Sequence, residues 1–197
     1  MSLNFTIRRF PTLLSTNTFA KELIAKAGPE ERLDYTVITC DRQTRGYGTH
    51  GRTWSSLEGN LFFSLIWPLK GLSTAYTGDL ALVAGFALLM WAKPLLPRER
   101  LTLKWPNDVQ VNGRKMVGIL IEIEPPYAIV GVGLNLVASP PEVTEATHLN
   151  RYVKVALSAE QTLPPILESL GEWFQRYQER GLASLIPQML PYFMKTG

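Results

Sequence analysis

Residues 104–122 read KWPNDVQVNGRKMVGILIE, and this stretch contains the turn and strand signals around which the predicted fold is organised. Pro106 has a fixed φ and favours an extended conformation in the residue before it, so the backbone turns at the start of the stretch. Asn112-Gly113 lies between two apolar segments, and this dipeptide is a strong signal of a two-residue type I′ hairpin loop. We therefore predict a hairpin of residues 109–111 and 116–122.

The two-residue loop also predicts how the strands pair. The expected pairs are Val111 with Arg114, Gln110 with Lys115, and Asp108 with Val117. Side chains alternate between the faces of a strand, so Asp108, Gln110 and Lys115 share one face and Lys115 lies diagonal to Asp108. The other face, which we expect in the core, carries Val109, Val111 and Met116, with Arg114 near the tip. The polar face is either a chemically active group or an ordinary solvated surface.

Composition indicates a globular domain of ordinary size. The chain has 197 residues, of which 46% are hydrophobic and 19% charged, and a chain of this length can bury its own core. The net charge of +3 is too small to specify nucleic acid. One cysteine, Cys40, excludes an internal disulfide, and with only two histidines it argues against a zinc site. Without a long apolar run or a signal peptide, we expect a cytoplasmic protein with no membrane association.

The remaining patterns predict one α+β domain with a central mixed sheet packed by helices. Predicted strands are residues 4–10, closed by Pro11, and residues 35–40, 60–67, 101–104 and 127–136. Two predicted helices begin at the N-caps Ser15 and Ser158. Two further helices are predicted for residues 75–93 and 182–189. Gly131 and Gly133 are unfavourable inside a strand, so they mark either a bulge or a place where a group packs directly on the backbone.

Residues 42–54, RQTRGYGTHGRTW, follow the second strand and are rich in glycine and in hydrogen-bond donors. Successive free backbone N–H groups in such a loop can form an anion-binding concavity, reinforced here by Arg45, His50 and Arg52. The pattern is not a P-loop, because the Gly-Lys-Ser/Thr sequence is missing. The alternative is a flexible glycine-rich connection.

Four segments, in this order, resemble the biotin protein ligase family. They are Ser15-Thr16-Asn17, Gln43 with the loop ending Gly51-Arg52-Thr53-Trp54, the block Lys104-Trp105-Pro106-Asn107-Asp108 followed by Gly113-Arg114-Lys115 and Gly118, and Gly131-Val132-Gly133-Leu134-Asn135. The resemblance covers nearly the whole chain. It implies a biotin/lipoate ligase fold, which is like that of class II aminoacyl-tRNA synthetases.

The resemblance also implies an activity and a set of site residues. The family joins biotin to ATP, releasing pyrophosphate, and passes biotin from biotinyl-adenylate to a lysine of a biotin carboxyl carrier protein. The implied catalytic residues are Lys115, placed between the biotin carboxylate and the phosphate, and Arg52. The implied biotin-binding residues are Ser15, Thr16, Asn17, Gln43, Gly46, Tyr47, Gly48, Thr49, Lys115 and Gly118. The implied ATP and adenylate residues are Arg52, Trp54, Asn107, Asp108, Gly131, Gly133 and Asn135. Mg²⁺ is expected with ATP, near Asp108, and no metal is expected to be bound by the protein alone.

Two departures from the family pattern affect these expectations. The family loop usually reads Gly-Arg-Gly-Arg-x-Gly-Arg, whereas Tyr47 and Thr49 replace its first two arginines. The loss of two cations would cost about 1 to a few kcal/mol of charge-assisted contact, so we expect a loosely held adenylate and a poorly ordered loop, unless Arg45 substitutes. Residues 1–197 correspond to the catalytic domain. We therefore expect no N-terminal helix-turn-helix domain, no C-terminal β-barrel and no nucleic-acid partner, while a homodimer stays open.

Two other functions remain alternatives. One is a non-catalytic protein that binds biotin or its adenylate, which would fit the altered loop. The other is a lipoate or octanoyl transferase of the same fold, in which Cys40 would be the nucleophile. Cys40 lies inside a predicted strand, where a buried and unreactive thiol is the more common state.

Overall fold

The computed structural model describes residues 3–70 and 77–193. Within these ranges, seven strands form one mixed sheet in the order β1-β2-β3-β7-β6-β5-β4. The strands are β1 (Thr6–Leu13), β2 (Thr36–Gln43), β3 (Leu61–Pro68), β4 (Leu101–Lys104), β5 (Asp108–Val111), β6 (Arg114–Glu124) and β7 (Tyr127–Leu134). β1 and β2 are parallel, and all other neighbours in the sheet are antiparallel. The predicted α+β class with a mixed sheet is therefore confirmed.

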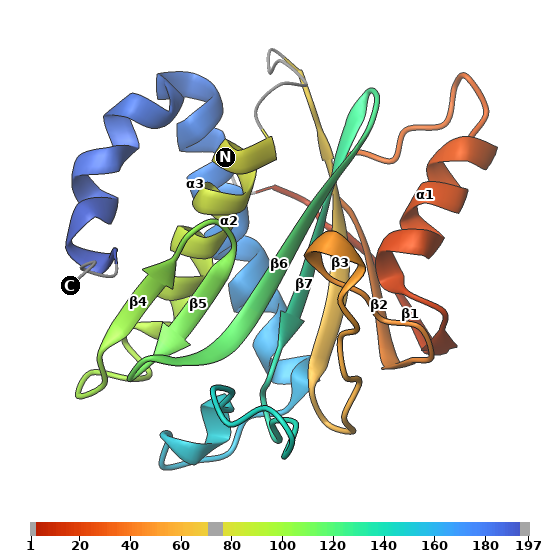
Figure 1. Cartoon of the computed structure of the whole chain (residues 1–197). Helices are drawn as coiled ribbons and strands as arrows, with labels where there is room; N and C mark the ends of the chain where they lie inside the picture. Colours follow the sequence, from red (N-terminus) through yellow and green to blue (C-terminus); the bar gives the residue numbers. More distant parts are fainter. Residues whose placement is uncertain (1–2, 71–76, 194–197) are drawn as a thin grey trace.

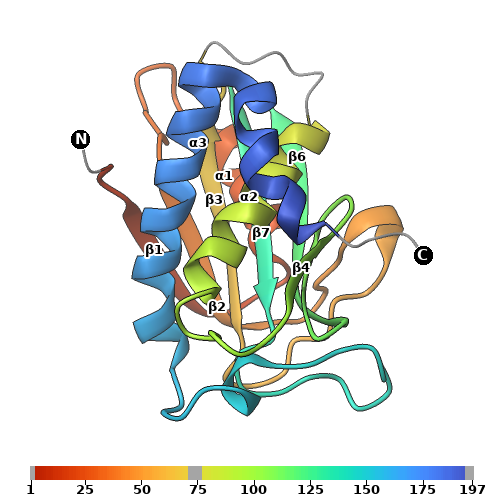
Figure 2. The same cartoon turned by 90° about the vertical axis from the view of Figure 1, so that its left-hand side faces the viewer.

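Helices cover the two faces of the sheet unequally (Figure 1). The helix α1 (Thr16–Lys26) lies on one face, against β2, β3 and β7. The helices α2 (Thr77–Ala92) and α3 (Ala159–Met189) lie on the other face, side by side (Figure 2). The larger core lies on the side of α2 and α3, and a smaller cluster around Ala20, Ile38 and Ile129 lies beneath α1. Because α1 is short, part of its face of the sheet is left for a loop and a cavity.

The central hairpin has the predicted loop. Asn112 and Gly113 have φ values of 52° and 79°, as a type I′ turn requires. The predicted pairs Val111–Arg114 and Gln110–Lys115 are confirmed.

One predicted pair is wrong, because β6 contains a β-bulge. Asp108 lies opposite Gly118 rather than Val117, and Val117 lies opposite Val109. Met116 is the extra residue, and Met116 and Val117 are both buried in the core. The extra residue changes the alternation of side chains, so Lys115 and Gly118 face the same side although they are three residues apart. A Cβ on Gly118 would lie 3.1 Å from Lys115 Cε.

The ends of several elements also differ from the prediction. β1 continues through Pro11 to Leu13, because an edge strand tolerates a residue without an N–H. Ser158 is the N-cap of α3 and forms a capping box with Gln161. α3 bends at Gly181 (φ 70°, ψ 165°), which separates the predicted helix of residues 182–189 from the longer part. Residues 75 and 76 of the predicted second helix lie outside the described residues. No helix in the described ranges is long and apolar enough to cross a membrane.

Candidate functional site

A cavity lies on the α1 side of the sheet, beside the N-terminal end of that helix, and four separate segments line it. They are residues 15–17, the glycine-rich loop of residues 43–55, the hairpin residues 107–120, and residues 131–146 of β7 and the loop after it. All the site residues predicted from the sequence line this cavity except Gly46. Gly46 is buried behind the loop, where a Cβ would lie 2.8 Å from the carbonyl oxygen of Trp54. The structure thus brings the predicted residues together, while their individual roles stay predictions.

Gly118, Gly131 and Gly133 line the cavity from the sheet and form its floor, and they allow side chains to lie directly on the backbone. A Cβ on Gly131 would be 2.2 Å from Asn17 Oδ1, and Cβ atoms on Gly118 and Gly133 would be 2.5 and 2.4 Å from the Trp54 ring. β7 keeps regular pairing with β3 and β6 through both of its glycines. The glycines therefore mark close packing rather than a bulge. The groups that approach the backbone are the side chains of Asn17 and Trp54.

One end of the cavity is a buried polar network. Gln43 Oε1 accepts hydrogen bonds from the Thr16 backbone N–H at 2.9 Å and from Thr16 Oγ1 at 3.3 Å. The Ser64 hydroxyl lies 2.7 Å from Thr16 Oγ1 and 2.5 Å from Asn17 Oδ1. Ser15 is the N-cap of α1 as predicted, but its side chain makes no capping bond and lines the cavity. Hydrogen-bonding groups thus surround this end in orientations that the network holds in place.

Lys115 and Asp108 lie on the same wall, near the loop after β7. Lys115 Nζ is 2.7 Å from Asp108 Oδ1 and 5.2 Å from the centre of the Trp54 ring. The Lys115 backbone donates to the Glu145 carbonyl at 2.7 Å and accepts from Thr147 N–H at 2.8 Å. The predicted diagonal contact is confirmed. Asp108 and Lys115 of this polar face line the cavity, whereas Gln110 is buried and does not, so the face is not an ordinary solvated surface.

Two asparagines on this wall connect it to the sheet. Asn107 Nδ2 donates to the Ile119 carbonyl at 2.8 Å, and Asn107 and Asp108 both line the cavity. The backbone N–H of Asn135 donates to the Met116 carbonyl at 2.9 Å. The described residues contain no cluster of three or more His, Cys, Asp or Glu side chains able to hold a metal ion. The amide and carboxylate oxygens of Asn107 and Asp108 suit Mg²⁺, but further oxygen ligands would have to come from a phosphate.

The glycine-rich loop folds back on itself beside the cavity. Trp54 N–H donates to the Gly46 carbonyl at 2.9 Å, and Gly48 N–H donates to the Arg52 carbonyl at 2.7 Å. Arg52 is exposed at the edge of the cavity, which it lines. Arg45 is exposed and does not line the cavity, so its position in the ligand-free chain gives no support to its substituting for the two missing arginines.

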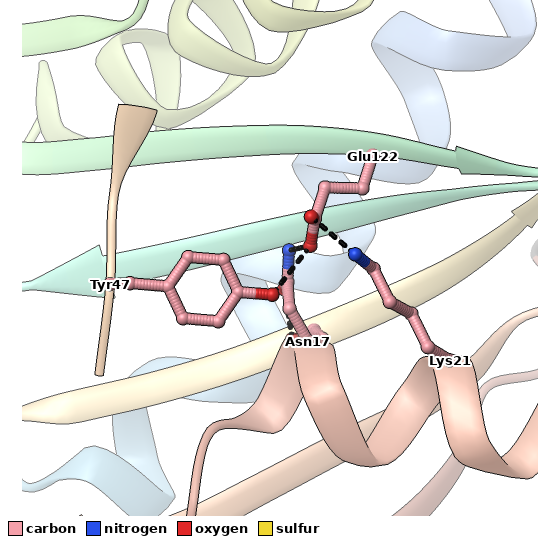
Figure 3. A network of polar contacts seen from close by, with 5 residues as sticks. Asn17, Lys21, Tyr47 and Glu122 are labelled. Carbon is pink, nitrogen blue, oxygen red and sulfur yellow. Dashed lines mark hydrogen bonds and ion pairs between the residues drawn. The ribbon is translucent and has the colours of Figure 1, made fainter. Parts of the chain in front are cut away.

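A second polar network, which the sequence analysis did not predict, centres on Glu122 (Figure 3). Its carboxylate accepts hydrogen bonds from Asn17 Nδ2 and Tyr47 Oη, both at 2.9 Å, and Lys21 Nζ lies 2.5 Å away. Burial alone would lower the pKa of Lys21, but the bond and charge of Glu122 raise it above its ordinary value. Asn17 and Lys21 are four residues apart and therefore share a helix face, which is the signal that was available in the sequence.

Cys40 is remote from these networks. Its side chain is 4% exposed and does not line the cavity. Burial, followed by the nearby charge of Asp41, raises the pKa of the Cys40 thiol to about 11. A neutral buried thiol is a poor nucleophile, which argues against the transferase alternative.

Comparison with known proteins gives related sequences of one kind. Residues 10–135 match the biotin/lipoate A/B protein ligase family. The chain is 35% identical over 146 residues to the biotin–[acetyl-CoA-carboxylase] ligase of Mycobacterium tuberculosis, covering 72% of this chain and 55% of that protein. It is 31% identical over 182 residues to the bifunctional ligase/repressor BirA of Escherichia coli, covering 88% and 54%. The chain thus spans about half the length of these curated relatives.

Solved structures with a fold similar to that of this chain include biotin protein ligases. The biotin protein ligase of Aquifex aeolicus in complex with biotin and ATP has a TM-score of 0.84 at 26% identity, covering 98% of this chain and 80% of that chain. The biotin protein ligase of Leishmania major in complex with biotinyl-5-AMP has a TM-score of 0.83 at 26% identity, covering 98% and 83%.

Proposed function

Because the chain belongs to the biotin/lipoate A/B protein ligase family, we propose that it is an ATP-dependent biotin protein ligase. It would form biotinyl-adenylate and transfer biotin to a lysine of a biotin carboxyl carrier protein in the cytoplasm. The observation that carries this proposal is the arrangement of the cavity. A buried polar network lies at one end, and the ion pair of Lys115 and Asp108 lies on its wall.

The polar end of the cavity favours biotin over lipoate or octanoate. The ureido ring of biotin carries a carbonyl acceptor and two N–H donors, which match the hydroxyl and amide groups of Thr16, Asn17 and Gln43. Lipoate and octanoate would place apolar atoms there, and each buried polar group left without a partner costs about 1–3 kcal/mol. The relative from Mycobacterium tuberculosis and the two solved structures compared above are biotin ligases by name, and they support the same choice.

In the first step, the biotin carboxylate attacks the α-phosphate of ATP and pyrophosphate leaves. Both reactants are anions, so a cation between them lowers the repulsion and stabilises charge that develops on the phosphoryl oxygens. Lys115 is a cation on the cavity wall, and its ammonium would leave the Asp108 carboxylate and contact the two substrates. No protein nucleophile is required, and catalysis depends mainly on positioning and electrostatics.

The nucleotide would occupy the side of the cavity near Trp54, Arg52 and Asn135. The Trp54 indole lies on the glycine floor and offers an apolar surface, while Arg52 offers a cation at the rim. Asp108 and Asn107 are the residues that would hold Mg²⁺ together with the triphosphate. Bound Mg²⁺ would offset phosphate charge.

A reconstitution experiment tests the proposal. Incubation with ATP, Mg²⁺, biotin and a carrier domain should give pyrophosphate first and a biotinylated carrier lysine afterwards. Binding calorimetry with biotin, run in parallel, identifies a non-catalytic binder, which would give heat but no pyrophosphate. Acyl transfer from lipoate or octanoate that is lost in Cys40→Ala would instead support the transferase alternative and contradict the proposal.

A further inference from the structure

Three elements that are distant in the sequence meet at the carboxylate of Glu122. Tyr47 comes from the glycine-rich loop, Asn17 and Lys21 from α1, and Glu122 from β6 (Figure 3). Glu122 does not line the cavity itself, but Asn17 and Tyr47 both do. The carboxylate is therefore placed to act on the cavity through these two side chains.

Glu122 determines the orientation of Asn17. The amide nitrogen of Asn17 donates to Glu122, and its oxygen lies 2.5 Å from the Ser64 hydroxyl. A carboxylate only accepts hydrogen bonds, so the amide cannot flip without losing the bond to Glu122. Asn17 also lies against the backbone at Gly131, which leaves it little room to move.

Tyr47 ties the glycine-rich loop to the same carboxylate. Burial and the bond to Glu122 raise the pKa of the Tyr47 hydroxyl, while the Thr18 hydroxyl lowers it, so the phenol stays protonated and donates. The residues on both sides of Tyr47 are glycines, which add no side-chain contacts to hold the loop. The side chain of Tyr47 links this loop to the sheet at Glu122, in addition to the Trp54 ring, which lies on Gly118 and Gly133.

Lys21 makes this arrangement electrostatically stable. The side chain of Glu122 is only 20% exposed, so placing its negative charge there has a desolvation cost that a nearby cation offsets. Lys21, at 2.5 Å, supplies the compensating charge from one turn further along α1.

We propose that Glu122, paired with Lys21, is a positioning residue that holds the glycine-rich loop through Tyr47 and orients Asn17, so that this end of the cavity is assembled before a ligand binds. The identity of the ligand as biotin rests on the proposed function, whereas the ordering of the loop does not.

Hydrogen exchange of the ligand-free chain directly tests whether the Tyr47–Glu122 hydrogen bond orders the loop. Tyr47→Phe removes one hydroxyl and keeps the ring, and amides of residues 46–54 should exchange about 10- to 100-fold faster, the range expected for loss of a hydrogen bond to a charged group. Tyr192→Phe is the matched control, because it removes a hydroxyl that contacts Lys93, outside the cavity. Unchanged loop exchange in Tyr47→Phe, or faster exchange spread over the whole sheet, would overturn the proposal.

Steady-state kinetics distinguish a residue that positions the binding site from one that takes part in the chemical step. Tyr47→Phe and Lys21→Met should raise the KM for biotin about 10-fold and leave kcat for adenylate formation within about 3-fold, whereas Lys21→Arg should restore the wild-type KM. An equal fall of kcat in both variants would contradict a positioning role. If the wild type binds no biotin but Tyr47→Phe still speeds amide exchange in the loop, the proposed function is wrong and the ordering of the loop by Tyr47 and Glu122 is supported.

Discussion

Lys115 is held by an anion of the protein in the ligand-free chain. The ion pair with Asp108 keeps the ammonium on the cavity wall, where the proposed reaction needs a cation between two anions. Asp108 thus holds Lys115 at the cavity, and in the proposed reaction a substrate anion would replace the Asp108 carboxylate as the partner of the ammonium.

Replacing Lys115 should remove most of the proposed activity. Lys115→Met keeps the length of the side chain and removes the charge, and pyrophosphate release should fall about 100- to 1,000-fold, as for loss of one preorganised transition-state contact. Lys154→Met, at an exposed lysine outside the cavity, is the control and should behave as the wild type. Pyrophosphate release that Lys115→Met leaves unchanged would contradict the proposed role.

The glycine floor makes a steric prediction. In Gly131→Ala, the new methyl group would lie 2.2 Å from Asn17 Oδ1, so Asn17 must leave its position and biotin affinity should fall at least about 10-fold. Gly28→Ala is the matched control, because nothing lies within 4 Å of the new methyl group. Calorimetric titration with biotin measures both variants, and equal affinities would show that the close approach has no importance for binding.

Cys40 predicts a dependence of stability on pH. The unfolded thiol, with a pKa near 9.0, loses its proton before the folded thiol, with a pKa of about 11. Rising pH therefore favours the unfolded state. The free energy of unfolding of the wild type should fall by up to about 3 kcal/mol relative to Cys40→Ala between these pH values. Urea unfolding at several pH values measures this difference, and parallel curves for the two proteins would refute it.

At the scale of elements, the glycine-rich loop carries the two replacements, Tyr47 and Thr49, that the sequence analysis identified as a departure from the family pattern. Tyr47 contacts Glu122, so one of the two replaced positions has a contact that helps to order the loop. Thr49 lines the cavity with a neutral side chain. The expectation of a poorly ordered loop is thereby weakened, while the expectation of a loosely held adenylate stays open at Thr49.

The rate at which biotinyl-adenylate dissociates tests this loop. The double variant Tyr47→Arg/Thr49→Arg adds two cations and should slow dissociation about 10-fold or more, because each charge-assisted contact contributes about 1.5–3 kcal/mol. Thr49→Arg alone keeps the Tyr47–Glu122 hydrogen bond, so it measures the effect of a cation at position 49 by itself. Equal dissociation rates in the wild type and both variants would remove the idea that these replacements weaken retention.

Local signals predicted many elements, and longer-range contacts explain the differences. The hairpin loop at Asn112-Gly113 and the N-cap at Ser158 depend on residues close in sequence, and both are confirmed. The bulge at Met116 has no local signal, since an apolar residue fits either alternation. Pro11 is tolerated because β1 is an edge strand, a fact that depends on the order of the whole sheet.

At the scale of the molecule, the cavity depends on folding of the entire sheet. Its lining residues come from four segments between residues 15 and 146, and the resemblance to the family, carried by motifs in these segments, predicted that they meet. The sequence analysis missed Ser64, Lys21 and Glu122, because their importance depends on which strands and helix face one another. It also did not predict that the Trp54 ring would lie on Gly118 and Gly133.

Ligand binding should therefore stabilise the whole chain. Biotin at 100 times its Kd should add about 2.7 kcal/mol, which corresponds to a rise in Tm of about 5–10 °C for a domain of this size. Lipoate at the same concentration should give a much smaller rise, since it cannot satisfy the polar end. Thermal unfolding followed by circular dichroism measures both shifts, and a lipoate shift equal to that of biotin would contradict the assigned specificity.

The bulge in β6 lets the strand carry one more core residue without turning the ammonium away from the cavity. Lys115 and Gly118 are three residues apart and would face opposite sides of a regular strand, and they share the cavity side because Met116 and Val117 both enter the core. Deleting either Met116 or Val117 would restore regular alternation, so the lysine and the glycine would still share a face while the core would lose one apolar side chain. Straightening the strand at its present length would instead place the lysine and the glycine on opposite sides of the sheet.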